Sequence, residues 1–158
     1  MTARLNYASH AREQIKHLNA LSALGRKALG DTLIDMIEIR VSQINGCAFC
    51  LDMHVKEAKI HGERELRVHH IAIWRESTLF TDRERAALRW AEAVTRLGVH
   101  GVCDKIYEQV RAHFSEQELS ELTFAIASIN AWNRLAISFQ AVPGSLDAVY
   151  GLDKSGLE

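Results

Sequence analysis

The 158-residue sequence contains only one proline, Pro143, and only three cysteines. Without a proline-rich linker or an internal repeat to divide the chain, we expect a single domain over residues 1–158. Three cysteines do not make a structural disulfide framework in a chain of this length. They instead favour redox or metal chemistry.

The sequence also lacks a long apolar segment and a surplus of charge. Its most apolar stretch, Phe124–Trp132, is too short to span a bilayer, and residues 1–20 contain no apolar core of the signal-peptide type. We therefore expect a cytoplasmic protein that does not bind membranes. The formal net charge is −1 and no basic patch dominates, so nucleic acid is not an expected partner either.

Strand patterns are scarce, whereas helical periods are frequent. Apolar residues recur at helical spacing between Leu33 and Ile44, and two capping boxes, Thr81 with Glu84 and Ser115 with Glu118, mark helix starts. Hydrophobic residues make up 47% of the chain, which is ordinary for a globular domain. These patterns predict an all-α fold.

The residues with the clearest chemistry are Cys47, Cys50 and His54. At positions i, i+3 and i+7 they fall on one face of a helix. The turn signal Asn45-Gly46 precedes them, so this helix is expected to begin near Cys47. Backbone N–H groups at a helix start favour thiolate, and a nearby imidazole can take or return a proton. The pattern therefore indicates a dithiol redox site with an acid–base partner.

Two other interpretations of this motif stay open. Cys47, Cys50 and His54 also have the spacing of zinc ligands, and a fourth ligand would come from His61, His69 or His70. No second Cys-x-x-Cys knuckle exists, which weakens this interpretation. The simplest alternative is two small core residues and a solvated histidine. We favour the redox interpretation and expect no metal and no cofactor.

The run Ile39–His54 resembles the core of alkylhydroperoxidase D-like (AhpD-like) proteins, which belong to the carboxymuconolactone decarboxylase superfamily. The run Ile129–Leu135 resembles their second characteristic segment. The likeness extends from about residue 5 to 144, leaving 145–158 as a tail that docks on a neighbouring subunit or frays. The resemblance implies a helical bundle of about six to eight helices, a homo-oligomer that is a trimer or hexamer, and peroxide reduction through the cysteine pair.

The resemblance also implies roles for individual residues. Cys50 is the expected peroxidatic thiol, and Cys47 is the resolving thiol and the first contact for the reductant. His54 and an acid relay protons. The family has a glutamate twelve positions before the first cysteine, and this chain has Asp35 there, one methylene shorter. Glu38, one helical turn further on, is a possible supporting residue.

The function implied is that of a thiol-dependent peroxidase, an oxidoreductase of antioxidant defence with a peroxide as substrate. Its cycle predicts an intrachain Cys47–Cys50 disulfide, restored by an unidentified thiol reductant, either a protein or a lipoyl-type dithiol. AhpD proteins proper have a histidine just before the second cysteine, where this chain has Phe49. This difference makes the entrance more apolar and removes one group from the proton relay.

Three alternative functions use the same chain differently. A general protein disulfide reductase or redox sensor would use the same two cysteines on a protein partner. A carboxymuconolactone decarboxylase-type enzyme would have no obvious need for a cysteine pair. A non-enzymatic module stabilised by zinc would contain stoichiometric metal.

Overall fold

The computed structural model describes residues 2–157, which form helices and contain no β-strand. In chain order the elements are α1 (Tyr7–His10), α2 (Arg12–Leu29), α3 (Asp31–Asn45), α4 (Ala48–Ile60), α5 (Glu65–His70), η1 (Ile71–Ile73), α6 (Asp82–Thr95), α7 (Asp104–Arg111), α8 (Glu116–Phe139), α9 (Asp147–Tyr150) and η2 (Leu152–Ser155). The all-α prediction is confirmed. The described residues hold nine α-helices rather than six to eight, because α1 and α9 are single turns of four residues.

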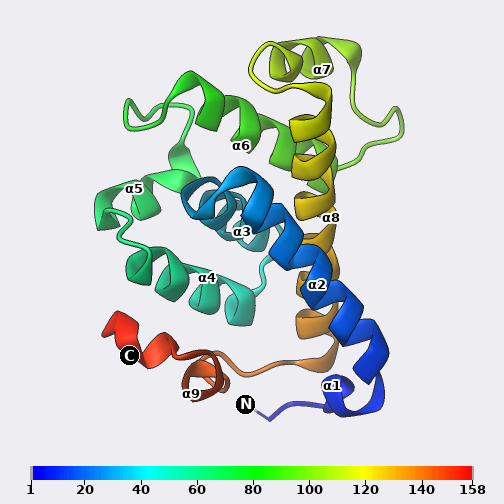
Figure 1. Cartoon of the computed structure of the whole chain (residues 1–158), viewed down its shortest axis with the longest axis vertical. Coiled ribbons are helices and arrows are strands. Elements are labelled where there is room, and N and C mark those ends of the chain that lie inside the picture. The colour runs from blue at the N-terminus through cyan, green and yellow to red at the C-terminus, as the bar shows by residue number, and fades with distance from the viewer. Residues whose placement is uncertain (1, 158) are drawn as a thin grey trace.

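Helix α3 lies at the centre of the molecule, against α2, α4, α6 and α8 (Figure 1). Its apolar residues are among the most buried in the chain, with Ile34, Ile37 and Val41 each at most 1% exposed. The long helix α8 runs alongside it and contributes Leu122 and Ile126 to the same core. A helix buried on most sides in this way holds its polar residues in fixed positions.

The helix starts and ends follow the local signals in the sequence. Both predicted capping boxes are present, at Thr81 and at Ser115. Gly46 ends α3 in the left-handed conformation, with φ 69°, which glycine adopts without steric cost. The next helix begins at Ala48 with Cys47 as its N-cap residue. Helix α3 begins at Asp31 and has Gly30 as its N-cap residue.

A close approach of two helices positions α2. Gly25 lies against α8, where a Cβ atom added to it would be 3.0 Å from the Cβ of Ala125. A larger side chain would hold the helices apart. The next residue along α2 is Arg26, which this packing directs toward α3 and α4.

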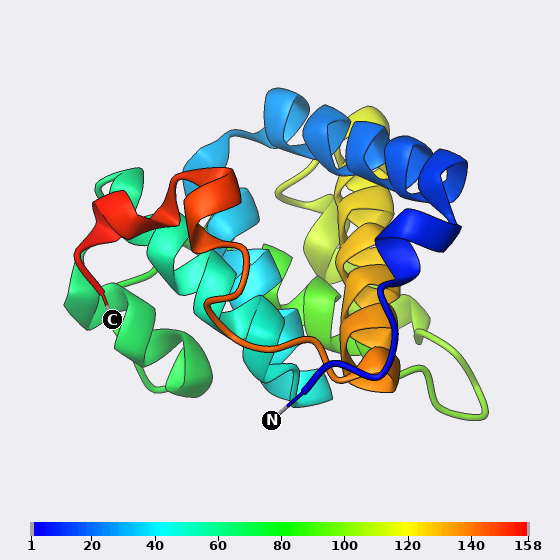
Figure 2. The ribbon, with the colours of Figure 1, turned by 90° about the horizontal axis from the view of Figure 1, so that it is seen from below.

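The C-terminal segment packs on its own chain, so the expectation that it frays is wrong for its described residues, and docking on a neighbouring subunit stays a prediction. The segment folds back along α4 (Figure 2), and Leu152 and Ser155 are buried. The ammonium group of Lys56 on α4 lies 2.6 Å from Asp147 and 3.0 Å from Asp52. Glu158 lies outside the described residues. Between residues 2 and 157, every helix is too short or too polar to cross a membrane.

Candidate active site

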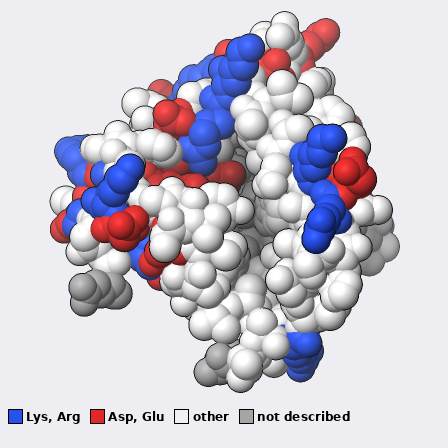
Figure 3. All heavy atoms as spheres, turned by 60° about the horizontal axis from the view of Figure 1, so that its bottom comes forward, with Lys and Arg blue, Asp and Glu red and all other residues white. Residues whose placement is uncertain are grey.

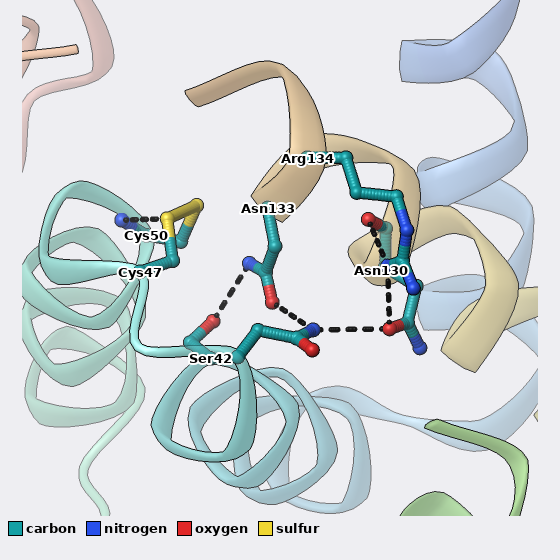
Figure 4. The surroundings of a disulfide bond; sticks show 7 residues. Ser42, Cys47, Cys50, Asn130, Asn133 and Arg134 are labelled. Atoms are coloured by element: carbon teal, nitrogen blue, oxygen red, sulfur yellow. Dashed lines mark hydrogen bonds between the residues drawn. A yellow bond between two sulfur atoms is a disulfide. The ribbon is translucent and has the colours of Figure 1, made fainter. Parts of the chain in front are cut away.

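Cys47 and Cys50 form a disulfide at the start of α4, with their Cα atoms 5.4 Å apart (Figure 4). The backbone of Cys47 is extended, and its Sγ accepts a hydrogen bond from the Cys50 N–H at 3.3 Å. The Cys47 sulfur therefore lies at the positive end of the helix dipole. Both residues are buried, at 2% and 3% exposure. The pairing agrees with the prediction, and its redox activity stays a prediction.

A polar network fixes the turn that carries the cysteines (Figure 4). The side-chain amide of Asn45 donates to the amide oxygens of Asn130 at 3.0 Å and Asn133 at 2.8 Å. Asn133 in turn donates to the Oγ of Ser42 at 3.1 Å, and the Ser42 carbonyl accepts from the Cys47 N–H at 3.0 Å. These bonds tie the end of α3 to α8 and hold the first turn of α4 in place.

A cavity of about 320 Å³ lies beside the disulfide, and Cys50 is in its wall whereas Cys47 is not. Most of the wall is apolar or aromatic, formed by Tyr7, Ile15, Phe49, Met53, Trp132, Leu146 and Tyr150 together with smaller residues. The polar part consists chiefly of Arg26, Glu38, His54 and Glu57. The face shown in Figure 3 is hollowed, and most atoms around the hollow belong to uncharged residues. The fold thus exposes one sulfur of the pair to a largely apolar space.

His54 lies between two carboxylates. Its Nδ1 atom is 2.8 Å from the Oε2 of Glu57 on the same helix and 3.3 Å from the Oε2 of Glu38 on α3. The guanidinium of Arg26 reaches in from α2, with Nη2 2.6 Å from Glu38 and 3.6 Å from Glu57. Three helices therefore supply one cluster of ionisable groups at the cavity wall.

Asp35 lies on the far side of Arg26 from this cluster. It is 1% exposed, it accepts a hydrogen bond from Arg26 at 2.6 Å, and its other oxygen is 2.7 Å from the Nδ1 of His61. Among the described residues, its side-chain partners are these two and do not include His54. The structure thus brings Cys50, His54 and Glu38 to one cavity and leaves Asp35 outside its wall.

The α3–α4 turn explains why Glu38 and not Asp35 faces His54. In a helical hairpin, residues at similar distances from the turn lie opposite each other. Glu38 is nine residues before Cys47 and His54 is seven after it, so these two meet. Asp35 is twelve residues before Cys47 and meets His61, fourteen after it. The expected relay from Asp35 directly to His54 does not match this register.

The ionisation of the cluster is set by burial and by the neighbouring charges. Burial raises the pKa of Glu38, and the opposing effect of His54 and Arg26 does not cancel it. Burial lowers the pKa of His54, but the carboxylates of Glu38 and Glu57 outweigh this and raise it above its ordinary value. Burial also raises the pKa of Glu57, which the hydrogen bond to His54 more than offsets, so its pKa is lowered. His54 therefore retains a proton to higher pH than a free histidine.

Arg26 was missed in the sequence. The only available signal was a basic residue beside the small Gly25 on an otherwise amphipathic helix, and nothing in the cysteine motif points to it. Burial alone lowers the pKa of Arg26, but Glu38, Asp35 and Glu57 outweigh it and raise the pKa further. The guanidinium therefore stays charged and neutralises part of the acidic cluster.

The same cluster has the composition of a metal site, since ligand atoms of Glu38, His54 and Glu57 lie within 4.8 Å of one another. The guanidinium of Arg26, however, stands where a cation would bind. The histidines considered as fourth zinc ligands are directed elsewhere: His61 contacts Asp35, His70 contacts Ser77 at 2.9 Å, and His69 is exposed. The geometry favours ion pairing over metal ligation.

Known proteins resemble this chain over most of its length. The model of the carboxymuconolactone decarboxylase family matches residues 11–93, which include both cysteines. The uncharacterized protein YdfG of Bacillus subtilis is 36% identical over 139 residues, which cover 87% of this chain and 95% of YdfG.

Two crystal structures share the fold. One is a protein of unknown function from Agrobacterium tumefaciens, proposed to be the antioxidant defence protein AhpD. It is 42% identical with a TM-score of 0.85, and the match covers 90% of this chain and 98% of that one. The other is an uncharacterized peroxidase-related protein from Ralstonia eutropha with an alkylhydroperoxidase AhpD core. It is 23% identical with a TM-score of 0.75, over 88% of this chain and 75% of that one.

Proposed function

The chain belongs to the carboxymuconolactone decarboxylase family and is AhpD-like, and we propose that it is a thiol-dependent peroxidase of antioxidant defence. The observation that carries this proposal is the position of Cys50. Its sulfur, half of a Cys-x-x-Cys pair, lies in the wall of the cavity that also contains His54 and Glu38. A nucleophile and an acid–base pair in one enclosed space are what peroxide reduction requires.

In the first step the Cys50 thiolate attacks the terminal oxygen of a hydroperoxide. The S–O bond forms as the O–O bond breaks, and the leaving alkoxide takes a proton from His54 to become an alcohol. Cys50 becomes a sulfenic acid. The sulfur is oxidised by two electrons, and the peroxide is reduced by the same two.

In the second step the Cys47 thiolate attacks the Cys50 sulfur and expels hydroxide, which leaves as water after protonation. This restores the disulfide. An external dithiol then returns two electrons by thiol–disulfide exchange. We place its attack on Cys50, which lines the cavity, and not on Cys47 as the family resemblance implied. Cys47 is suited to leave as a thiolate, because the helix start stabilises negative charge on its sulfur.

The proton relay is assigned to His54 with Glu38 and Glu57. Glu38 and Glu57 both face the Nδ1 atom of the imidazole and favour its protonated form. Arg26 fixes Glu38 at 2.6 Å, and Asp35 fixes Arg26 at 2.6 Å from the opposite side. Asp35 is thus proposed as a positioning residue that acts through Arg26.

Turnover of cumene hydroperoxide with dithiothreitol as reductant tests this function. Cys50→Ser should abolish turnover, because no cavity nucleophile remains. In a single turnover after the dithiothreitol has been removed, Cys47→Ser should allow one attack and then stop at the sulfenic acid, which dimedone traps. His54→Ala should slow the reaction by roughly 10²–10⁴-fold. Cys103→Ser is the matched control, since Cys103 is exposed and unpaired, and it should behave as wild type.

Burial of the sulfurs supports a peroxidase over a general protein disulfide reductase. Exchange with a protein partner requires an accessible sulfur, whereas Cys47 and Cys50 are 2% and 3% exposed. A small hydroperoxide reaches Cys50 through the cavity. A double variant separates the peroxidase from a lactone decarboxylase. If the chain were a decarboxylase, Cys47→Ser/Cys50→Ser would keep lactone decarboxylation.

We also propose that the chain assembles as a homo-oligomer, a trimer or hexamer. Several large apolar side chains are exposed, including Leu24 at 63% and Phe124 at 61%. Leu24 and Phe124 are the chain neighbours of Gly25 and Ala125, which are in contact where α2 and α8 pack together. An exposed apolar pair on two packed helices favours burial against another subunit.

A further inference from the structure

The cavity beside Cys50 has one arginine or lysine side chain in its wall, and this cation is already paired. The guanidinium of Arg26 lies 2.6 Å from both Asp35 and Glu38, and 3.6 Å from Glu57. Asp31 lies 3.3 Å from the same guanidinium, so four carboxylates surround a single permanent positive charge. No part of that charge is left to balance an anionic ligand.

The imidazole of His54 does not supply a free cation either. Its Nδ1 faces Glu57 at 2.8 Å and Glu38 at 3.3 Å, so its charge when protonated is matched within the cluster. If Glu38 and His54 share one proton, the pair is neutral as a unit. Arg26 then contributes one positive charge, while Asp31, Asp35 and Glu57 contribute one negative charge each, and the count gives a net charge of about −2.

Among the described residues, the remaining wall adds no further positive charge to balance a negative ligand. It is mostly apolar or aromatic, with Phe49 and Met53 next to Cys50 along the chain and Trp132 on α8. A carboxylate in this space would be desolvated and would meet like charge at short range, where the protein screens it far less than water does. An uncharged ligand meets neither penalty, and its hydroxyl or hydroperoxyl group can donate to the carboxylates.

We propose that this cavity selects uncharged hydroperoxides that carry an apolar group and excludes those that carry a carboxylate. The inference rests on the proposed function in naming a hydroperoxide as the substrate. The selection itself depends only on the charges and the wall of the cavity. Glu38, Glu57 and Arg26 are its determinants.

A binding measurement tests the selection without any turnover. The disulfide form of the full chain is titrated with octanol and with octanoate by calorimetry at neutral pH, because the two probes match in chain length and differ in charge. Octanoate should bind at least about tenfold more weakly than octanol, since like charge in a desolvated site disfavours binding. Equal affinities, or binding of neither probe, would overturn the proposal.

A variant pair shows whether the cluster is responsible. Glu57→Gln removes one negative charge from the cavity wall and should narrow the difference in binding affinity between octanol and octanoate. Glu65→Gln removes one negative charge from α5, where that side chain is 71% exposed, and should leave the difference unchanged. If Glu57→Gln showed the same difference in affinity between the two probes as wild type, the assignment of the selection to this cluster would be refuted.

A turnover assay distinguishes failure of the charge selection from failure of the peroxidase function. The hydroperoxides of linoleic acid and of its methyl ester differ in the carboxylate, and the ester should be consumed at least about tenfold faster. Equal consumption of both hydroperoxides would support the peroxidase function and refute the charge selection. Discrimination between octanol and octanoate with no consumption of either hydroperoxide would keep the selection and refute the peroxidase.

Discussion

The carboxylate of Glu38 lies 3.3 Å from the Nδ1 of His54, across the contact between α3 and α4. If this contact keeps His54 protonated for the reaction, Glu38→Gln should lower hydroperoxide turnover by about 10²-fold, at the low end of the range for acid–base groups. Its pH–rate profile should also move to lower pH, because His54 loses a neighbour that raises its pKa. Glu65→Gln is the control. A Glu38→Gln profile that overlays wild type would remove Glu38 from the relay.

Asp35 should matter more for stability than for chemistry. Asp35→Asn breaks a buried ion pair with Arg26 and should lower the free energy of unfolding by about 3–5 kcal/mol. Asp35→Glu forces an extra methylene into a site that is 1% exposed and should cost about 1–3 kcal/mol.

Asp31→Asn is the matched control for both, because Asp31 contacts the same arginine at 3.3 Å but is 52% exposed. Its effect should stay within about 0.5 kcal/mol. Denaturant titration measures all three variants. If Asp35→Glu raised turnover above wild type, a direct role for this carboxylate in the relay would be supported over a positioning role.

The stability of the fold should fall with rising pH through His54. The folded chain holds this proton more tightly than the unfolded chain, since Glu38 and Glu57 raise the pKa of His54. Its contribution is complete below the ordinary value of 6.5 and is lost as the pH rises through the raised folded value. The free-energy gap between wild type and His54→Gln should therefore shrink as the pH rises above 6.5. A constant gap would contradict this assignment.

We expect the assembly to depend on the exposed apolar side chains of Leu24 on α2 and Phe124 on α8. Phe124→Lys places a charge at a side chain that is 61% exposed, so the folded chain should tolerate it while the interface should not. Sedimentation should show wild type as a trimer or hexamer and the variant closer to the 17.8 kDa chain. Lys105→Ala, on the neighbouring α7, is a control that should keep the assembly. A wild-type monomer at micromolar concentration would exclude the oligomer.

Much of the fold is readable from local signals in the sequence. The capping boxes at Thr81 and Ser115, and the left-handed glycine at position 46, act over a few residues and mark the helix ends that the structure has. The cysteine pair is likewise local, because Cys47 is the N-cap residue of the helix whose first turn contains Cys50, which brings the two sulfurs together. Such features need no knowledge of the tertiary fold.

The acid–base cluster could not be predicted in the same way. The partner of His54 depends on how α3 and α4 meet, and a motif counted along the chain points to Asp35 although the hairpin register selects Glu38. Arg26 comes from a third helix, whose approach depends on packing at Gly25. The packing of the tail on α4 could not be predicted for a related reason, since its contact with Lys56 joins positions far apart in sequence.

The proposed dithiol cycle is tested by counting the thiols and the products in a single turnover. Fully reduced protein is mixed with one equivalent of cumene hydroperoxide, free thiols are titrated, and the peptide containing Cys47 and Cys50 is weighed by mass spectrometry. The dithiol cycle predicts one equivalent of alcohol, the loss of two thiols per chain and the loss of two hydrogens from that peptide, with Cys103 still free. An unchanged thiol count, or a disulfide that joins Cys103 to either cysteine, would contradict it.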